Sequence, residues 1–286
     1  MNSASETFSK CRKLYKDVLL GYSYVASHNL YIKHFKEVDI GEINEIKESI
    51  IEECKRKGLL SEKEKTKILI ENEIWTQDKE DEIKSLTEQI ANHQQAKTKL
   101  FIKAQLNAVQ KQIDTKSEKL ENLIIEKDSV LGLTLEKYSE KKSSEQVIRL
   151  ALFKDKNLEK NLFSEEEYEE LEPKDLDPLI NIYSIVLSEF TEKRLKMMAA
   201  ASFFMNNLML CKNNPFIFFG KPVVNLTNFQ MEVFSQGLSY KSVLEKGSSP
   251  SVEFHSDLEK MVEWYESAGH LEKISEKEKT EKLREL

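Results

Sequence analysis

Between Gly58 and Gly132 the sequence is LLSEKEKTKILIENEIWTQDKEDEIKSLTEQIANHQQAKTKLFIKAQLNAVQKQIDTKSEKLENLIIEKDSVL, without one glycine or proline. Glycine and proline interrupt helices more strongly than other residues, so their absence predicts nearly continuous helix. The segment Ser61–Glu64 has the spacing of a capping box, which predicts that a helix begins there. We therefore expect almost all of residues 61–131 to be helical.

Apolar and long side chains in this stretch recur at alternating spacings of three and four residues, as they do in coiled coils. They form two seams, offset from one another: Ile83, Leu86, Ile90, His93, Lys97 and Leu100, then Leu106, Val109, Ile113, Lys116, Leu120, Leu123, Lys127 and Val130. The break falls near Leu100–Ile102. This pattern predicts either an antiparallel helical hairpin, with its tip in a polar segment such as residues 91–97, or one long helix with a stutter. We favour the hairpin, because it lets the chain bury its own seam.

The rest of the chain predicts a compact helical body into which the hairpin is inserted. We expect residues 1–60 and 146–270 to form the two parts of the body, residues 61–145 to form the hairpin, and residues 271–286 to form a charged tail. The expected fold class is mainly α, with a long antiparallel, coiled-coil-like hairpin and at most one small β hairpin.

Several local signals predict where helices of the body begin and end. Asp177-Pro178 predicts an N-cap and a first helical residue, followed by a buried apolar helix to about Leu210. Gly41 is expected to separate two N-terminal helices, and Gly237 to end a later one. Further capping boxes are expected at Ser164–Glu167, Thr227–Gln230 and Ser256–Glu259.

The composition excludes several classes of protein. Acidic residues outnumber basic ones 50 to 43, which argues against a dedicated duplex-binding protein. No uncharged apolar run is long enough to span a membrane, so we expect no membrane association. The three cysteines are far apart and odd in number, which does not fit a secreted disulfide scaffold. The first residues lack the pattern of a signal peptide, so we expect a cytoplasmic location.

The sequence lacks the motifs typical of phosphate binding, metal binding and nucleophilic catalysis. Gly220-Lys221 lacks the upstream glycine and the following hydroxyl residue of a phosphate-binding loop. His28 and His34 are six residues apart, which is not a ligand spacing on one helix face, and no Cys-x-x-Cys pair occurs. No Gly-x-Ser-x-Gly motif marks a nucleophile. We therefore expect no metal, no cofactor and no catalytic residues.

Nucleic-acid binding is the alternative function that the sequence offers. Basic residues lie close to aromatic ones at Lys10–Lys16 and Lys33–Lys36, and Lys55–Lys57 forms a third cluster. Proteins that bind single strands combine positive charge with aromatic side chains on which bases stack. Such clusters are more often solvated helix faces, so we do not favour this function.

Protein binding is the function that we favour, and residues 213–231 are the expected docking region. Phe216–Phe219 has the composition of a strand, Gly220-Lys221-Pro222 turns the chain, and residues 223–226 would be the returning strand. Strand alternation would send Phe219 outward if Phe216 and Phe218 faced inward. The predicted partner-binding residues are Phe216, Phe218, Phe219 and Lys221.

Several segments of the chain resemble proteins of large tailed bacteriophages. They are Trp75-Thr76, Lys79-Glu80, Glu82-Ile83, Phe218-Phe219-Gly220-Lys221-Pro222 and Leu226-Thr227-Asn228-Phe229-Gln230, and the Lys-, Asn- and Ile-rich composition is similar to that of AT-rich phage genomes. Within that group the chain is similar to virion-assembly components, such as baseplate or tail-assembly factors. The resemblance implies a structural or assembly role that depends on contacts with other proteins, with virion components or with further copies of the chain.

Overall fold

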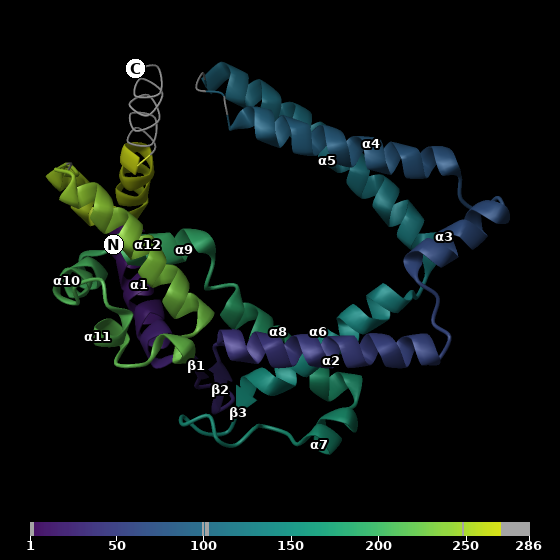
Figure 1. Ribbon diagram of the computed structural model, residues 1–286, viewed down its shortest axis with the longest axis horizontal. Helices are drawn as coiled ribbons and strands as arrows, with labels where there is room; N and C mark the ends of the chain where they lie inside the picture. Colours follow the sequence, from purple (N-terminus) through teal and green to yellow (C-terminus); the bar gives the residue numbers. More distant parts are fainter. Residues whose placement is uncertain (1–2, 99, 101–102, 248, 270–286) are drawn as a thin grey trace, which may run out of the picture. The chain divides into compact units, whose positions relative to one another are not determined.

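The computed structural model describes residues 3–98, 100, 103–247 and 249–269 (Figure 1). Helices account for most of these residues, so the predicted mainly α fold class is confirmed. The charged tail expected at residues 271–286 lies outside the described residues. Of the helices in the described part of the chain, none combines the length and apolar character needed to cross a membrane.

The chain divides into two compact units. Met1–Glu45 together with Ser144–Leu286 form the first, called the body unit below, and Ile46–Ser143 form the second, called the hairpin unit. Two helices, α2 (Glu37–Arg56) and α6 (Leu135–Ala151), contain the limits between the units. The sequence placed the corresponding limits near residues 60 and 145.

A small antiparallel sheet follows the first helix of the body unit. Helix α1 (Ser3–Leu20) ends at Gly21, whose φ of +80° lies in the left-handed region that glycine adopts without steric cost. Strands β1 (Tyr22–Val25) and β2 (Leu30–Lys33) form a hairpin, and β3 (Leu152–Phe153) pairs with β2. The small β hairpin of this fold therefore lies near the N-terminus.

The hairpin unit confirms the predicted antiparallel helical hairpin. Its two arms are α4 (Gln77–Lys97) and α5 (Lys103–Leu131), which contact each other extensively. An ion pair between Lys79 and Glu126 joins the first turn of α4 to the last turns of α5, as only antiparallel arms allow. The seams therefore pack against each other within one chain.

The tip of the hairpin lies further along the chain than residues 91–97. Helix α4 continues through this segment, and Lys97 Nζ donates a hydrogen bond to Gln110 Oε1 across the arms at 2.6 Å. The predicted tip at 91–97 is therefore wrong, because its alanine, glutamine and lysine residues are good helix formers whose polarity suits an exposed helix. The predicted break near Leu100–Ile102 falls between the two arms, although Phe101 and Ile102 lie outside the described residues.

A short helix, α3 (Glu62–Glu71), precedes the hairpin arms. Its predicted capping box is confirmed, since the Ser61 N–H donates to Glu64 Oε2 at 2.8 Å and the Glu64 N–H donates to Ser61 Oγ at 3.3 Å. Lys65 Nζ donates to the carbonyl oxygen of Leu131 at 3.0 Å, at the end of α5. Helix α3 is thereby fastened to the base of the hairpin.

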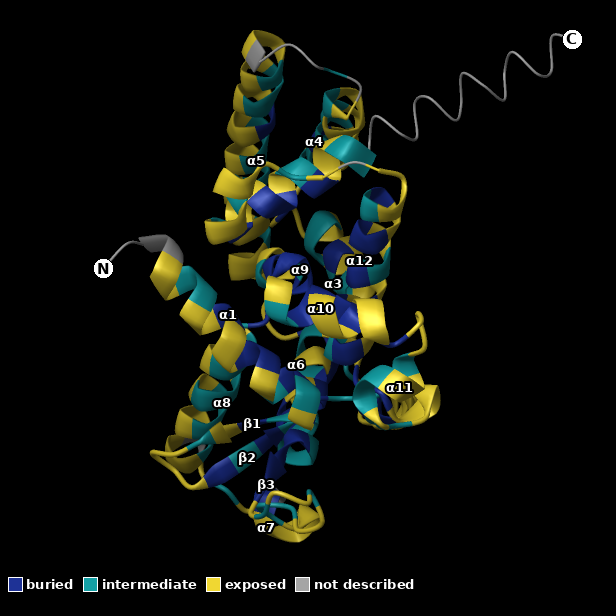
Figure 2. Cartoon of the chain, turned by 90° about the vertical axis from the view of Figure 1, so that its left-hand side faces the viewer, coloured by how far each residue is buried: buried dark blue, intermediate teal, exposed yellow. Residues whose placement is uncertain are grey.

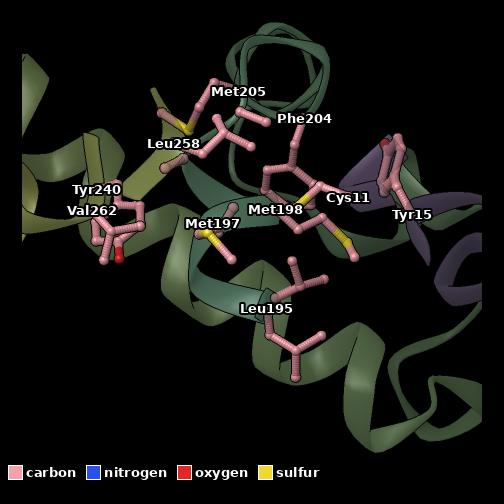
Figure 3. Packing of buried hydrophobic residues seen from close by; sticks show 14 of the residues in the cluster. Cys11, Tyr15, Leu195, Met197, Met198, Phe204, Met205, Tyr240, Leu258 and Val262 are labelled. Carbon is pink, nitrogen blue, oxygen red and sulfur yellow. The ribbon is translucent and has the colours of Figure 1, made fainter. Parts of the chain in front are cut away.

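The remaining helices build the core of the body unit. They are α7 (Glu165–Glu169), α8 (Pro173–Leu187), α9 (Glu192–Ala200), α10 (Ser202–Leu210), α11 (Pro215–Phe219), α12 (Asn228–Glu245) and a last helix at residues 258–269, with 3₁₀ turns η1 (Val223–Asn225) and η2 (Val252–Ser256). Helix α9 packs along α12 and against α1. Met198 and Phe204 are fully buried and Tyr240 nearly so (Figure 3). The apolar stretch around Met198 is thus part of the core.

The long apolar helix expected over residues 177–210 is divided into three. Helix α8 already begins at Pro173, so Pro178 lies inside the helix and does not start it. Thr191 begins α9 as a side-chain N-cap, and Ala201, with extended backbone, separates α9 from α10. The prediction was wrong because neither break contains a glycine or proline, whereas a single capping residue such as Thr191 is enough to start a new helix.

Two of the three further capping boxes, at Ser164–Glu167 and Thr227–Gln230, are confirmed. The third, at Ser256–Glu259, is wrong. The cap there is Asp257, whose Oδ1 accepts from the N–H groups of Glu259 at 3.2 Å and Lys260 at 3.3 Å. Turn η2 includes Ser256, so the last helix starts one residue later than predicted.

Two glycines that were expected to end or separate helices lie inside them. Gly41 is in the interior of α2, and Gly237 is in the interior of α12. A Cβ on Gly237 would lie 2.5 Å from Cε1 of Phe204, which is far closer than van der Waals contact. Glycine at this position therefore allows α10 to approach α12 closely.

Candidate protein-interaction surface

Residues 216–219, expected to form a strand, belong instead to helix α11. Asn214 is its N-cap, with Oδ1 accepting from the Phe216 N–H at 2.9 Å, and Pro215 occupies the first helical position. Gly220 ends the helix with a φ of +67°, and its N–H donates to the Phe216 carbonyl at 2.8 Å. The predicted strand is wrong because these capping signals outweigh the β propensity of the aromatic residues between them.

The returning strand expected at residues 223–226 is also wrong. Its first three residues form the 3₁₀ turn η1, which follows Pro222. The Leu226 N–H donates to the Val223 carbonyl at 3.0 Å, within this segment. The Leu226 N–H, which in a β hairpin could bond to the opposite strand, is therefore bonded within its own turn.

The helical conformation changes which of the predicted partner-binding residues face solvent. In a strand Phe216 and Phe218 would share a face, whereas successive residues of a helix turn by about 100° and lie on neighbouring sides. Phe216 and Ile217 are 54% and 59% exposed, while Phe218 and Phe219 are partly buried against the core. Phe219 therefore does not face outward, as strand alternation would have placed it.

Phe218 and Phe219 attach α11 to the core of the body unit. The ring of Phe218 lies 5.0 Å from that of Phe204 and 5.5 Å from that of Phe234, measured between centroids. The ring of Phe219 lies 5.8 Å from that of Phe234. Tilted and edge-to-face pairs at these distances are favourable geometries for aromatic rings. The inner side of α11 is thus held by aromatic packing.

The turn before α11 contains two residues with positive φ and is stabilised by hydrogen bonds. Lys212 and Asn213 both have positive φ, at 52° and 60°, a conformation that costs non-glycine residues roughly 1–2 kcal/mol each, less for asparagine. Lys241 Nζ donates to Asn213 Oδ1 at 2.6 Å, and the Asn214 N–H donates to the Cys211 carbonyl at 3.0 Å. These bonds offset the strain and fix the direction in which α11 leaves the turn.

Large apolar side chains from α10, α11 and η1 are exposed to solvent. We call this segment the 209–224 surface, and its exposed apolar members are Met209, Leu210, Phe216, Ile217, Val223 and Val224. Figure 2 shows exposed residues on α11. The sequence prediction included only Phe216 among them. The Asn-Pro pair before α11 and the glycine after it are the signals that could have revealed the helix.

Lys221 takes a different place from the one expected at the rim of a docking site. Its side chain is half-buried, and its Nζ would lie 3.7 Å from a Cβ built on Gly21. Burial lowers the pKa of Lys221, and the positive charge of Lys36 lowers it further. Lys221 therefore packs on the body unit, beside the end of α1.

Ion pairs within the chain neutralise part of the positive charge of the basic clusters at Lys10–Lys16, Lys33–Lys36 and Lys55–Lys57. One lysine of each is ion-paired: Lys10 with Glu6, Lys33 with Asp39 and Lys57 with Glu53. Tyr15 of the first cluster is buried in the core and does not offer a stacking surface. These contacts reduce the unpaired positive charge and the exposed aromatic surface that the clusters can present to a nucleic acid.

Groups that could perform chemistry are sparse in the described residues. No group of three or more His, Cys, Asp or Glu side chains within them is placed to hold one metal ion. The cysteines are buried free thiols, and burial raises the pKa of Cys11. A comparison of the chain with protein-family models, curated proteins and solved structures finds no match. Function must therefore be inferred from the chain itself.

Proposed function

We propose that this chain is a non-enzymatic protein-protein interaction protein, a structural or assembly factor of a tailed-phage particle. The observation that carries the proposal is the 209–224 surface, where exposed apolar side chains lie on a fixed backbone. The proposal includes a location in the cytoplasm of a bacterial host, with incorporation into the virion. The phage assignment rests on the sequence resemblance alone.

Rigid placement of the exposed side chains is what makes this surface suited to binding. Burial of apolar area contributes roughly 25 cal/mol per Å², but association must also offset the ordering of flexible groups. The caps at Asn214 and Gly220 and the packing of Phe218 already order α11 in the free protein. A partner that covers Phe216 and Ile217 therefore meets a preorganised surface.

The predicted partner is another protein, which includes a second copy of the chain. Co-expression of the chain with the products of the genes that flank its own, followed by purification and measurement of the dissociation constant, tests the proposal. We expect a complex with a tail or baseplate protein. Ile217→Asp should weaken it about 30-fold, as for a hot spot of about 2 kcal/mol.

Ile185→Asp is the matched control for this experiment. Ile185 is 57% exposed on α8 of the same unit, against 59% for Ile217, so both substitutions place a charge on an exposed isoleucine. The control should bind like the wild type. Equal loss in both variants, or none in either, would reject the 209–224 surface as the interface. Salt-dependent retention of the chain on DNA, without a protein partner, would favour the nucleic-acid alternative.

A further inference from the structure

The small sheet of the body unit is paired along one edge and, within the described residues, unpaired along the other. At the β3 edge the Leu162 N–H donates to the Leu152 carbonyl at 2.8 Å. The Lys154 N–H donates to the Lys160 carbonyl, also at 2.8 Å. Residues 160–162 therefore occupy that edge as an irregular further strand. The opposite edge is formed by β1, because the strand order is β1-β2-β3.

The outward-facing backbone groups of β1 belong to Tyr22 and Tyr24. The His34 N–H donates to the Gly21 carbonyl at 2.9 Å. In an antiparallel pair, residues that bond to the neighbouring strand alternate with residues whose N–H and C=O groups point away from it. Ser23 therefore bonds to β2, whereas Tyr22 and Tyr24 direct their backbone groups to the other side. None of the described residues gives these groups a hydrogen-bond partner.

No charged residue and no proline protects this edge. Lysine, proline and inward-pointing charges are the usual means by which proteins keep an open edge from pairing with another chain. The sequence of β1, Tyr-Ser-Tyr-Val, contains none of them, and tyrosine and valine favour extended backbone. Tyr24 is 48% exposed, so solvent reaches this strand. A further strand can therefore add to β1 through main-chain hydrogen bonds.

We propose that β1 pairs with β1 of a second copy of the chain, antiparallel and around a two-fold axis at Ser23. In this register Tyr22 of each copy faces Tyr24 of the other, and each such pair exchanges two hydrogen bonds. Because residues 160–162 already occupy the β3 edge, the described sheet then has no unpaired edge. The pairing therefore closes as a dimer and does not continue as a fibre. The inference does not depend on the proposed function.

The side chains of β1 are self-complementary in the same register. Tyr22 and Tyr24 lie on the same side of the sheet as Tyr31, with ring centroids 5.4 Å and 4.8 Å from that of Tyr31. Pairing at Ser23 brings Tyr22 of one copy beside Tyr24 of the other on this side, and aromatic cross-strand pairs stabilise sheets. The strand carries no charge that two copies would bring together. These observations favour a second copy over an unrelated strand.

Nuclear magnetic resonance of the chain labelled with ¹⁵N-tyrosine, recorded over a range of concentrations, tests the proposal. Each copy contributes a strand of only four residues, which is little beside the roughly 1,200 Å² of stable complexes, so we expect a reversible dimer at high concentration. Solvent exchange of the Tyr22 and Tyr24 amides should slow about 3-fold or more as sedimentation velocity shows the dimer forming. The Tyr31 amide, which bonds to β3 within the sheet, is the internal control.

Two substitutions of Tyr24 separate its backbone hydrogen bond from its ring. Tyr24→Thr and Tyr24→Pro both remove the ring, but only proline removes the outward N–H, and an edge strand accommodates proline at such a position. We expect Tyr24→Pro to dimerise about 10-fold or more weakly than Tyr24→Thr, since the two-fold axis removes the bond twice. Both variants should unfold at similar urea concentrations, because this N–H has no partner in the described part of the chain.

If Tyr24→Pro does not fold, a pair of charged variants decides. Side chains diagonal to each other across two strands are within reach when they are long. The proposed axis places Tyr24 of one copy in this relation to Tyr24 of the other. Tyr24→Lys and Tyr24→Glu should therefore each dimerise more weakly alone than a mixture of the two variants does.

Three results would overturn the proposal. They are a monomer at every concentration, equal dimerisation of Tyr24→Pro and Tyr24→Thr when both are folded, and a dimer that Ile217→Asp abolishes while Tyr24→Pro leaves it intact. The last result would place the contact between copies on the 209–224 surface, so it would refute this inference and support the proposed function. Failure of β1 to pair would leave the test of the 209–224 surface unchanged.

Discussion

Replacement of Gly237 by alanine should destabilise the body unit, although alanine is the better helix former. The added Cβ would lie 2.5 Å from Phe204 Cε1 and 2.9 Å from Leu208 Cδ2. Both neighbours are fully buried, and the ring of Phe204 packs against those of Tyr15 and Phe218. The ring therefore has little space into which it can move.

The magnitude follows from two opposing contributions. Extra methyl groups in a packed core cost about 1–3 kcal/mol, while alanine in place of glycine inside a helix gains about 1 kcal/mol. Contacts as short as those at Gly237 put the cost near the upper end, so we expect a net loss of about 1–2 kcal/mol. Gly41→Ala is the matched control, since no atom beyond the adjacent residues and the local helix backbone lies within 4 Å of its Cβ position, and it should gain up to about 1 kcal/mol.

Urea unfolding followed by tryptophan fluorescence measures both changes. The chain has two tryptophans, Trp75 in the hairpin unit and Trp264 in the body unit. In a Trp75→Phe background the signal reports on the body unit, where both glycines lie. Equal or increased stability of Gly237→Ala would refute the close packing of α10 on α12. Destabilisation by Gly41→Ala would refute the assignment of Gly41 to an uncrowded helix interior.

Three further predictions follow from the structure. Burial lowers the pKa of His34 to about 4, so the unfolded state binds more protons between that pH and about 6.5. The body unit should therefore gain stability as the pH rises through this window, and His34→Gln should flatten the dependence of the urea midpoint on pH. Phe218→Ala should cost about 2–4 kcal/mol of unfolding free energy, because Phe218 packs on Phe204 and Phe234, whereas the exposed Phe216→Ala should change it by less than about 0.5 kcal/mol in the same urea assay. Carbodiimide cross-linking and mass spectrometry should join Lys79 to Glu126 and Lys119 to Glu82 within one chain, and a failure to find either link would contradict the antiparallel hairpin.

The helical hairpin could be predicted because its signal is local and repeated. Residues 59–131 contain no breaker, and the two seams need only each other to be buried. Capping boxes such as Ser61–Glu64 were predicted correctly for the same reason, since four residues contain the whole interaction. Signals of this kind do not depend on distant parts of the chain.

The sheet was missed because its strands are short and its turn has no glycine. Leu14, Val18 and Tyr22 fit one helical face, which hid the end of α1 at Gly21. Asn29 takes a positive φ of 48° in the hairpin turn, where glycine would have been a clearer sign. The third strand comes from far along the chain, and nothing local indicates that pairing.

The docking region was predicted in the correct segment but with an incorrect conformation. The aromatic residues at 216–219 favour a strand by composition, while Asn214, Pro215 and Gly220 determine a helix by capping. Whether the side chains follow the period of a strand or of a helix decides which of them are exposed. Ile217 is exposed as strand alternation predicted, whereas Phe216 is exposed and Phe219 is partly buried, the reverse of that prediction. Burial of Phe218 depends on Phe204 and Phe234, which only the tertiary structure brings close.

The claim that residues 209–224 form the interface is tested most directly by hydrogen–deuterium exchange of the chain, free and bound to its protein partner. We predict that binding slows exchange of the backbone amides of α11 and η1, because the partner covers Phe216, Ile217 and the valines at 223 and 224. Amides along α4 and α5 should exchange at the same rate in both states. Protection confined to the hairpin arms, with no change at residues 209–224, would contradict the account.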